Sequence, residues 1–190
     1  MEVSKEIFDI IKQRYIDEEL VIDEDYKIKN SDESYSIRIV GKIVIVSRYN
    51  GNELIEDMLY QHKKMSSKIE FDGDKKIVYN YSTYHEGKII NVKYYKNEKL
   101  HRIDGPALEY ANPTWEDYYY VGGRHISLAF FNKIRKNLKR GSLSNILERY
   151  GIEELEVIKE FVLEMGSERD LERVNKYILI KKLEGKNDSC

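Results

Sequence analysis

The feature that most constrains the fold is a pattern that occurs twice between residues 94 and 127. In each copy, residues 94–100 and residues 119–126, a tyrosine-rich stretch leads into a polar turn, and a basic residue and an apolar residue follow. The Asp-Gly-Pro sequence at residues 104–106 is a strong turn signal between the copies. Because tyrosine favours pleated, half-buried surfaces, the pattern predicts a β-meander built from repeated hairpins.

Alternating apolar and polar residues extend the predicted meander towards the N-terminus. Residues 35–49 indicate a hairpin or one long kinked strand, closed by a turn at residues 49–52. Residues 53–65 carry apolar side chains at helical spacing, which predicts a helix; the alternative is a further strand that starts at the turn. From residue 68 onward the alternation returns and indicates more hairpins.

Helical spacing marks both ends of the chain. Residues 4–16 predict a short helix capped by Ser4. The acidic stretch 17–25 is interpreted as a solvated loop with a short strand, because it lacks the glycine and the alternating oxygen ligands of a calcium-binding loop, which is the alternative. After Ser127, which can cap the first of them, helices are predicted over residues 128–140, 142–150, 153–165 and 168–183.

These elements predict an α+β fold: a short N-terminal helix, a central antiparallel β-meander of repeated hairpins and a C-terminal helical bundle. The expected segments are an N-terminal helix with the acidic stretch, the meander, the helical region and a tail, at residues 1–34, 35–127, 128–185 and 186–190.

Composition limits the cellular compartments and the classes of partner that we expect for this chain. The chain has 190 residues and a formal net charge of −2, so a general affinity for nucleic acid or anionic membranes is not expected. Cys190 is the single cysteine, which rules out a disulfide framework within one chain and indicates a reducing compartment. The N-terminus is too charged for a secretory signal, and no apolar run approaches the roughly 20 residues of a membrane span. We therefore expect a cytoplasmic protein.

A family resemblance rests on residues 100–110, Leu-His-Arg-Ile-Asp-Gly-Pro-Ala-Leu-Glu-Tyr, and on the aromatic residues and Gly-Gly turn that follow them. This string resembles the MORN-like hairpin repeats of giant-virus and bacteriophage proteins and of proteins labelled bacterial antitoxins. The resemblance covers about residues 78–127, and Glu98 stands where a glycine is typical. It implies a β-hairpin array that makes contacts rather than a catalytic centre. It also implies a viral or phage protein that acts on the host or in the virion, or an antitoxin-like binding protein.

The expected function is therefore a non-enzymatic protein–protein interaction module, whose helical end supplies a second contact or a homo-oligomer surface. No catalytic residue, metal ligand or cofactor is predicted. If exposed, a set of aromatic side chains would anchor the partner; if buried, they would fill the space between the sheet and the helices. The predicted anchors are Trp115, Tyr118, Tyr120 and Tyr95.

The alternative function is nucleic-acid binding, because the predicted helix that contains residues 131–140 carries five cations within eight residues. The competing interpretation is that the acidic helix 153–164 neutralises this charge. Exposed tyrosines would stack bases in the nucleic-acid case. The cations are Lys133, Arg135, Lys136, Lys139 and Arg140.

Three histidines, His85, His101 and His125, lie at the ends of predicted turns. Gathered on one sheet edge, they would hold zinc or act as acid–base groups in a small hydrolase or nuclease. A one-residue difference in register between His101 and His125 favours turn-supporting residues instead. Asp104 is interpreted as a turn residue paired with Arg102. The sequence contains no Gly-x-Ser-x-Gly, phosphate-loop or His-Glu-x-x-His motif.

Overall fold

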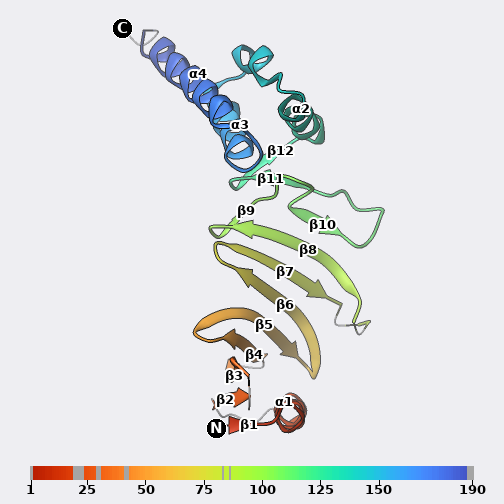
Figure 1. Ribbon diagram of the computed structural model, residues 1–190. Coiled ribbons are helices and arrows are strands. Elements are labelled where there is room, and N and C mark those ends of the chain that lie inside the picture. The colour runs from red at the N-terminus through yellow and green to blue at the C-terminus, as the bar shows by residue number, and fades with distance from the viewer. Residues whose placement is uncertain are drawn as a thin grey trace. The chain divides into compact units, whose positions relative to one another are not determined.

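The computed structural model describes residues 2–18, 24–28, 31–40, 43–82, 84–85 and 87–187. The chain forms two compact units. The first comprises Met1–Glu98 and Glu109–Glu116, and the second comprises Lys99–Leu108 and Asp117–Cys190, so their boundary falls inside the predicted segment 35–127. A two-residue strand, one helix, a series of strands and then further helices follow one another along the chain (Figure 1), which confirms the predicted α+β class.

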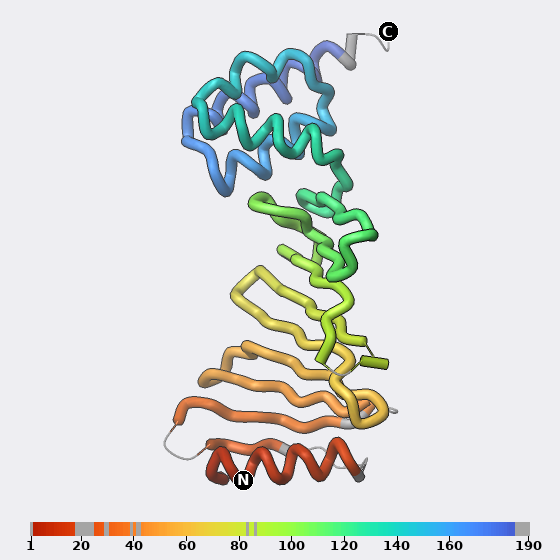
Figure 2. The backbone as a smooth tube through the Cα atoms, turned by 90° about the vertical axis from the view of Figure 1, so that its right-hand side faces the viewer, coloured from red at the N-terminus to blue at the C-terminus, as the bar shows by residue number. Residues whose placement is uncertain are grey.

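The first unit is a long sheet with one helix against its N-terminal strands. Its strands lie side by side in chain order, β1 parallel to β2 and each later neighbour antiparallel (Figures 1 and 2). The last two residues of β10 (Leu108–Tyr110) also belong to this unit and continue the sheet beside β8. The preceding elements are β1 (Glu2–Val3), α1 (Lys5–Glu18), β2 (Glu24–Ile28), β3 (Glu33–Val40), β4 (Ile43–Asn50), β5 (Glu53–Gln61), β6 (Lys64–Asp72), β7 (Lys75–Tyr81) and β8 (Ile89–Lys96).

The apolar core of this unit lies where α1 packs on the first strands. The N–H of Ile7 donates to the Ser4 side-chain oxygen at 3.3 Å, which confirms the predicted cap. The buried ring of Phe8 lies 4.1 Å from the Tyr35 ring and 5.6 Å from the Tyr26 ring, centroid to centroid. Part of the acidic stretch, residues 19–23, lies outside the described residues.

Beyond β5 the sheet is a single layer. Among the described residues of β5, β6, β7 and β8, no apolar side chain is fully buried. Neither of the two apolar cores includes a residue of β6, β7 or β8. Side chains on both faces of these strands are therefore half-exposed, and no packed interior holds this part of the sheet together.

The predicted helix at residues 53–65 is wrong, because this segment forms β5 and the start of β6. The alternative, a further strand after the turn at residues 51–52, is confirmed. Met58 pairs with Lys68 on one face of the sheet, and its neighbour Leu59 pairs with Ser67 on the other. Met58 packs against the first apolar core, but its neighbour Leu59 is an apolar residue on the opposite face, so adjacent apolar residues in one strand imitate helical spacing.

Within the described residues, five two-residue turns repeat along the chain, at residues 51–52, 62–63, 73–74, 97–98 and 122–123. The first residue of each turn has a φ between 49° and 59°, the left-handed region that glycine and asparagine adopt most easily. An aromatic residue stands two positions before each turn. The turns begin at Gly51, His62, Gly73, Asn97 and Gly122, and the aromatic residues are Tyr49, Tyr60, Phe71, Tyr95 and Tyr120. The repeat thus begins well before the two copies that the sequence pattern shows most clearly.

The second unit is a short hairpin covered by helices. Val121 and Ile126 of the hairpin are buried in one core with residues of all three α-helices, such as Phe131, Phe161 and Val174. The elements are β9 (Lys99–Leu100), β11 (Tyr119–Val121), β12 (Arg124–Ile126), α2 (Leu128–Lys139), η1 (Leu143–Asn145), η2 (Leu147–Arg149), α3 (Ile152–Met165) and α4 (Glu168–Asn187).

Two predictions for this unit need correction. Residues 142–150 form two 3₁₀ turns rather than one α-helix, and Leu143, Ile146 and Leu147 of this segment are buried. Spacings of three residues suit a 3₁₀ helix, in which side chains at i and i+3 overlie one another. The last helix runs to Asn187, so residues 186–187 of the predicted tail are helical. No helix in the described ranges is both long and apolar enough to cross a membrane.

Candidate partner-binding surface

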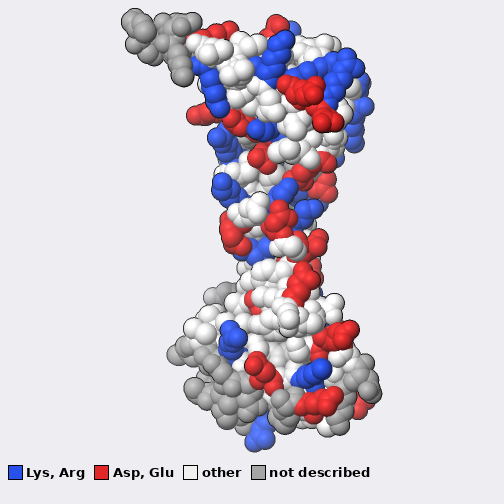
Figure 3. All heavy atoms as spheres, turned by 60° about the vertical axis from the view of Figure 1, so that its left-hand side comes forward, with Lys and Arg blue, Asp and Glu red and all other residues white. Residues whose placement is uncertain are grey.

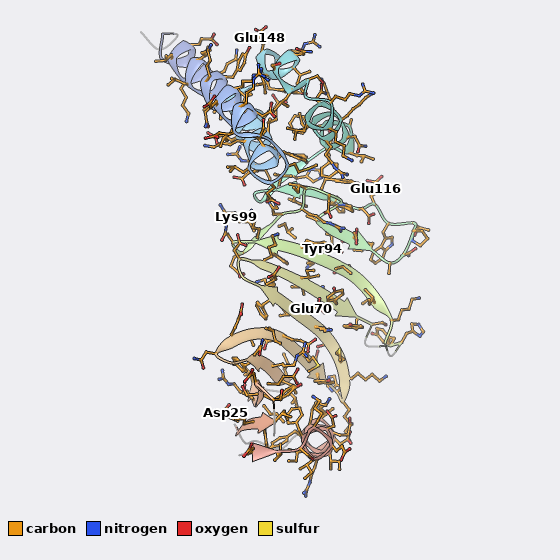
Figure 4. The ribbon with its side chains drawn as sticks, in the orientation of Figure 1. Asp25, Glu70, Tyr94, Lys99, Glu116 and Glu148 are labelled. Atoms are coloured by element: carbon orange, nitrogen blue, oxygen red, sulfur yellow. The ribbon has the colours of Figure 1, made fainter. Side chains whose placement is uncertain are left out.

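The loop at residues 109–116 of the first unit is ordered by local polar contacts. The Asn112 side-chain oxygen accepts the N–H of Thr114 at 3.1 Å and its hydroxyl at 2.9 Å, and the Asn112 carbonyl accepts the N–H of Trp115 at 3.0 Å. The N–H of Ala111 donates to the carbonyl of Ile90 on β8 at 2.9 Å. The loop is therefore an Asx turn tied to the sheet, and Figure 4 marks it at Glu116.

This loop holds Trp115 out towards solvent. The Trp115 side chain is 53% exposed, although tryptophan is highly buried on average. Its ring meets the half-buried ring of Tyr110 edge-on at 5.0 Å and an interplanar angle of 77°. Trp115 is therefore exposed rather than buried, and its indole is in contact with the Tyr110 ring of the same loop.

Tyr118 and Tyr120 belong to the second unit, where both rings lie near His125. Their centroids are 5.8 Å and 5.2 Å from the imidazole centroid. Tyr118 is 38% exposed and Tyr120 is half-buried. His125 is exposed and lines an open cavity of 560 Å³ with residues that include Arg124 and Phe130. These aromatic residues form a cluster of their own.

Tyr95, the remaining predicted anchor, lies in the first unit on β8. It pairs directly with Lys76 of β7, whose ammonium group lies 5.0 Å from the centre of the Tyr95 ring. The same ammonium group is bonded to Glu98 in the turn that follows. Tyr95 is half-buried beneath this pair, so its ring contributes to the sheet surface rather than to the Trp115 loop.

A row of acidic and basic side chains, which sequence reasoning missed, crosses the sheet from β4 to β7. The Nζ atom of Lys68 on β6 lies 2.7 Å from the carboxylate of Glu56 on β5 and 2.9 Å from that of Glu70. The Nε atom of Arg48 on β4 lies 3.2 Å from Glu56, at an angle that makes the contact an ion pair rather than an aligned hydrogen bond. The Tyr79 hydroxyl donates to Glu70 at 3.0 Å. We call these five residues the charge ladder.

The contacts within the ladder shift the pKa values of three of its members. Hydrogen bonds from Lys68 to Glu56 and Glu70 raise the pKa of Lys68. The hydrogen bond from Lys68 lowers the pKa of Glu70, and burial followed by the hydrogen bond to Glu70 raises the pKa of Tyr79. Figure 4 labels Glu70 in this region, and Figure 3 shows acidic and basic side chains interspersed on the face that it presents.

The two histidines of the second unit, His101 and His125, have different environments and do not form one site. His101 is buried; its Nδ1 accepts the N–H of Gly122 at 2.9 Å, and its Nε2 lies 2.7 Å from Glu164. The Nε2 contact is short, but it is poorly aligned for a hydrogen bond. His101 therefore supports the turn at residues 122–123. His85 is exposed in the first unit, and the described residues contain no group of three His, Cys, Asp or Glu residues suited to a metal ion.

Asp104 has the predicted structural role. The Nε of Arg102 donates to Asp104 at 2.6 Å, and its Nη1 donates to the carbonyl of Pro106 at 3.3 Å. Burial acts to raise the pKa of Asp104, but the hydrogen bond from Arg102 and its charge outweigh burial and lower it. The carboxylate and the guanidinium group together fix the turn before Pro106.

The cations of the predicted nucleic-acid surface lie on α2 and just after it. Phe131 and Ile134 turn inward into the core of the second unit. The guanidinium group of Arg135 lies 5.3 Å from the Phe131 ring centre, and the ammonium group of Lys133 lies 5.3 Å from the Tyr150 ring centre. Lys133, Lys136, Lys139 and Arg140 are exposed, and Arg135 is half-buried.

Known proteins add little to this geometry. No family model matches the sequence, and no curated protein matches it. A comparison with solved structures matches the crystal structure of TarM at a TM-score of 0.30 and 14% sequence identity. The match covers 72% of this chain but only 26% of the TarM chain, so it spans about a quarter of that structure. The resemblance of residues 78–127 to MORN-like repeats accordingly stays a prediction.

Proposed function

We propose that this chain is a non-enzymatic binding module that takes a protein partner on the Trp115 loop, residues 109–116. The observation that carries the proposal is the half-exposed indole on an ordered loop. Tryptophan is enriched among the residues that dominate interface energies. A loop that is already fixed also loses little conformational entropy on binding, which favours affinity.

The exposed part of Trp115 is large enough to act as an anchor. A tryptophan buries up to about 250 Å², so covering a side chain that is 53% exposed removes roughly 130 Å² from water. At about 25 cal/mol per Å², this amounts to about 3 kcal/mol. That value corresponds to roughly a hundredfold in the dissociation constant.

Trp115 also supplies its own assay, because it is the single tryptophan of the chain. The chain is immobilised and exposed to a lysate of the cells that produce it, and captured proteins are identified and purified. Titration of each purified candidate into the chain should shift the Trp115 emission to shorter wavelength and protect it from a soluble quencher, since the indole leaves water.

The decisive comparison is Trp115→Ala against Tyr84→Ala. Tyr84 is an aromatic residue of the same unit with 88% exposure, so its removal deletes a comparable exposed ring elsewhere. We expect Trp115→Ala to weaken the partner roughly a hundredfold and Tyr84→Ala to leave its affinity unchanged. Equal affinities of all three chains would contradict the proposal.

The aromatic cluster of the second unit, Tyr118 and Tyr120 around His125, is proposed as a secondary contact. Tyr118 keeps 38% of its surface exposed and directly precedes β11 of the hairpin. The resemblance to MORN-like arrays supports contact formation rather than catalysis. On that basis the partner would be a host or virion protein in the cytoplasm, or a toxin bound in an antitoxin-like manner.

A further inference from the structure

The stretch from residue 118 to residue 147 contains no aspartate or glutamate, whereas the whole chain has a net charge of −2. Its six cations are Arg124, Lys133, Arg135, Lys136, Lys139 and Arg140. Five of the six lie in or directly after α2. A local surface of one sign attracts an oppositely charged partner even when the whole molecule is nearly neutral.

Three of these cations form one row. An α-helix turns once every 3.6 residues or so, so Lys133, Lys136 and Arg140 project on the side opposite the buried residues Phe131 and Ile134. Arg140 keeps right-handed helical dihedrals as the C-cap, which leaves it in line with the other two. The row extends over about 10 Å, a length along which each strand of a B-form duplex presents about three phosphates.

The charge of this row is not neutralised within the part of the chain that the structure describes, where none of its three members forms an ion pair. Two carboxylates of the acidic helix α3 have other partners. Glu154 accepts the N–H of Gly151, and Glu156 lies 3.7 Å from Lys182. Within the described residues, no ion pair joins α3 to these three cations, so any neutralisation of the basic helix by α3 does not involve direct pairing with them.

We propose that Lys133, Lys136 and Arg140 bind the phosphate backbone of a nucleic acid without sequence preference. The row offers charge at phosphate spacing and no exposed aromatic side chain for stacking, so it suits the backbone and not the bases. A membrane surface fits less well. A helix that lies in the lipid interface needs apolar residues beside its cations, and Ala129 is the one apolar residue aligned with this row.

The test uses the full-length chain and fluorescence anisotropy of a labelled, mixed-sequence oligonucleotide of about 20 nucleotides, single-stranded and as a duplex. We expect weak binding, in the range of about 10⁻⁴ to 10⁻⁶ M. With three phosphate contacts, raising the salt from about 50 to about 200 mM should weaken single-strand binding about 20-fold.

The variant Lys133→Ala/Lys136→Ala/Arg140→Ala should lose most of this binding and most of its salt dependence. The matched control is Lys63→Ala/Lys75→Ala/Lys88→Ala, which removes the same charge from exposed positions of the first unit. Circular dichroism of both variants confirms that the helices are intact. Retained binding by the control together with loss in the α2 variant supports the proposal.

Three results would overturn it: no binding at low salt, equal loss in both triple variants, or preferential binding to another polyanion. The last is measured with polyglutamate as a competitor and with vesicles that contain anionic lipid. If polyglutamate displaces the oligonucleotide at equal charge, the row recognises acidic proteins. If vesicles are bound and the oligonucleotide is not, it recognises membranes. Capture at the Trp115 loop is measured separately, so either proposal can fail alone.

Discussion

Replacing Glu56 by glutamine tests whether the charge ladder stabilises the single-layer sheet. The side chain of Glu56 is 10% exposed, whereas those of Lys68 and Arg48 are 28% and 34% exposed. Exposed ion pairs contribute about 0–1 kcal/mol, and breaking a buried pair costs about 3–5 kcal/mol. Because Glu56 is nearly buried and its partners are partly solvated, we expect Glu56→Gln to lower the free energy of unfolding of the first unit by about 2 kcal/mol.

The assay is urea unfolding followed by the emission of Trp115, which belongs to the same unit. At a typical slope of about 2 kcal/mol per molar urea, the midpoint should fall by about 1 M. The control is Glu53→Gln, which removes an exposed carboxylate from the same strand and should change stability by no more than about 0.5 kcal/mol.

A double-mutant cycle separates the pair from its surroundings. If Glu56 acts through Lys68, then Lys68→Met combined with Glu56→Gln should cost less than the sum of the two single changes, by about 1 kcal/mol or more. Additive effects would show that Lys68 does not act through Glu56. Equal midpoints for Glu56→Gln and Glu53→Gln would refute the whole argument, since burial of the carboxylate would then be irrelevant.

Two further outcomes concern ionisation and a buried histidine. Because hydrogen bonding from Lys68 lowers the pKa of Glu70 below its ordinary value of 4.5, the stability from Glu70 is complete above that value and is lost as the pH falls through the lower folded-state pKa. The urea midpoint of the first unit should therefore fall on acidification, and Glu70→Gln should weaken that dependence. In the second unit, His101→Ala leaves the Gly122 N–H without its acceptor and should cost about 1–3 kcal/mol, measured by thermal unfolding of the helical signal. His101→Asn, whose amide oxygen can accept the same N–H, should recover part of this; equal stability of the two variants would argue against the bond.

Local chemistry explains what the sequence could predict. The Ser4 cap and the helix after it, the Ser127 cap at 3.2 Å from the N–H of Phe130, and the pair of Arg102 with Asp104 all depend on residues a few positions apart. Such contacts are encoded in short strings, and turn and cap preferences identify them. The hairpin repeat belongs to the same class, because each turn needs a residue that tolerates a left-handed φ.

Contacts between distant residues explain most of what was missed. His101 meets Glu164 across more than sixty positions of sequence, and no spacing rule links them. The contact between Tyr110 and Trp115 could not be predicted, because it depends on how the loop between them folds back. The strand at residues 53–61 was mistaken for helix for a different reason, since the usual alternation presumes apolar residues on one face and this strand carries them on both.

The single-layer sheet also explains the tyrosine-rich composition. Strands without a packed interior need side chains that cover their neighbours with an apolar stem and still present a polar end to water. Tyr79 and Tyr94 do this by donating their hydroxyls to Glu70 and to Glu109 at 3.0 and 3.2 Å. Trp115 departs from this arrangement, because in the described structure its indole N–H has no hydrogen-bond partner and half of its side chain is exposed. A side chain that the sheet itself does not require is the one for which an outside partner offers the simplest physical explanation.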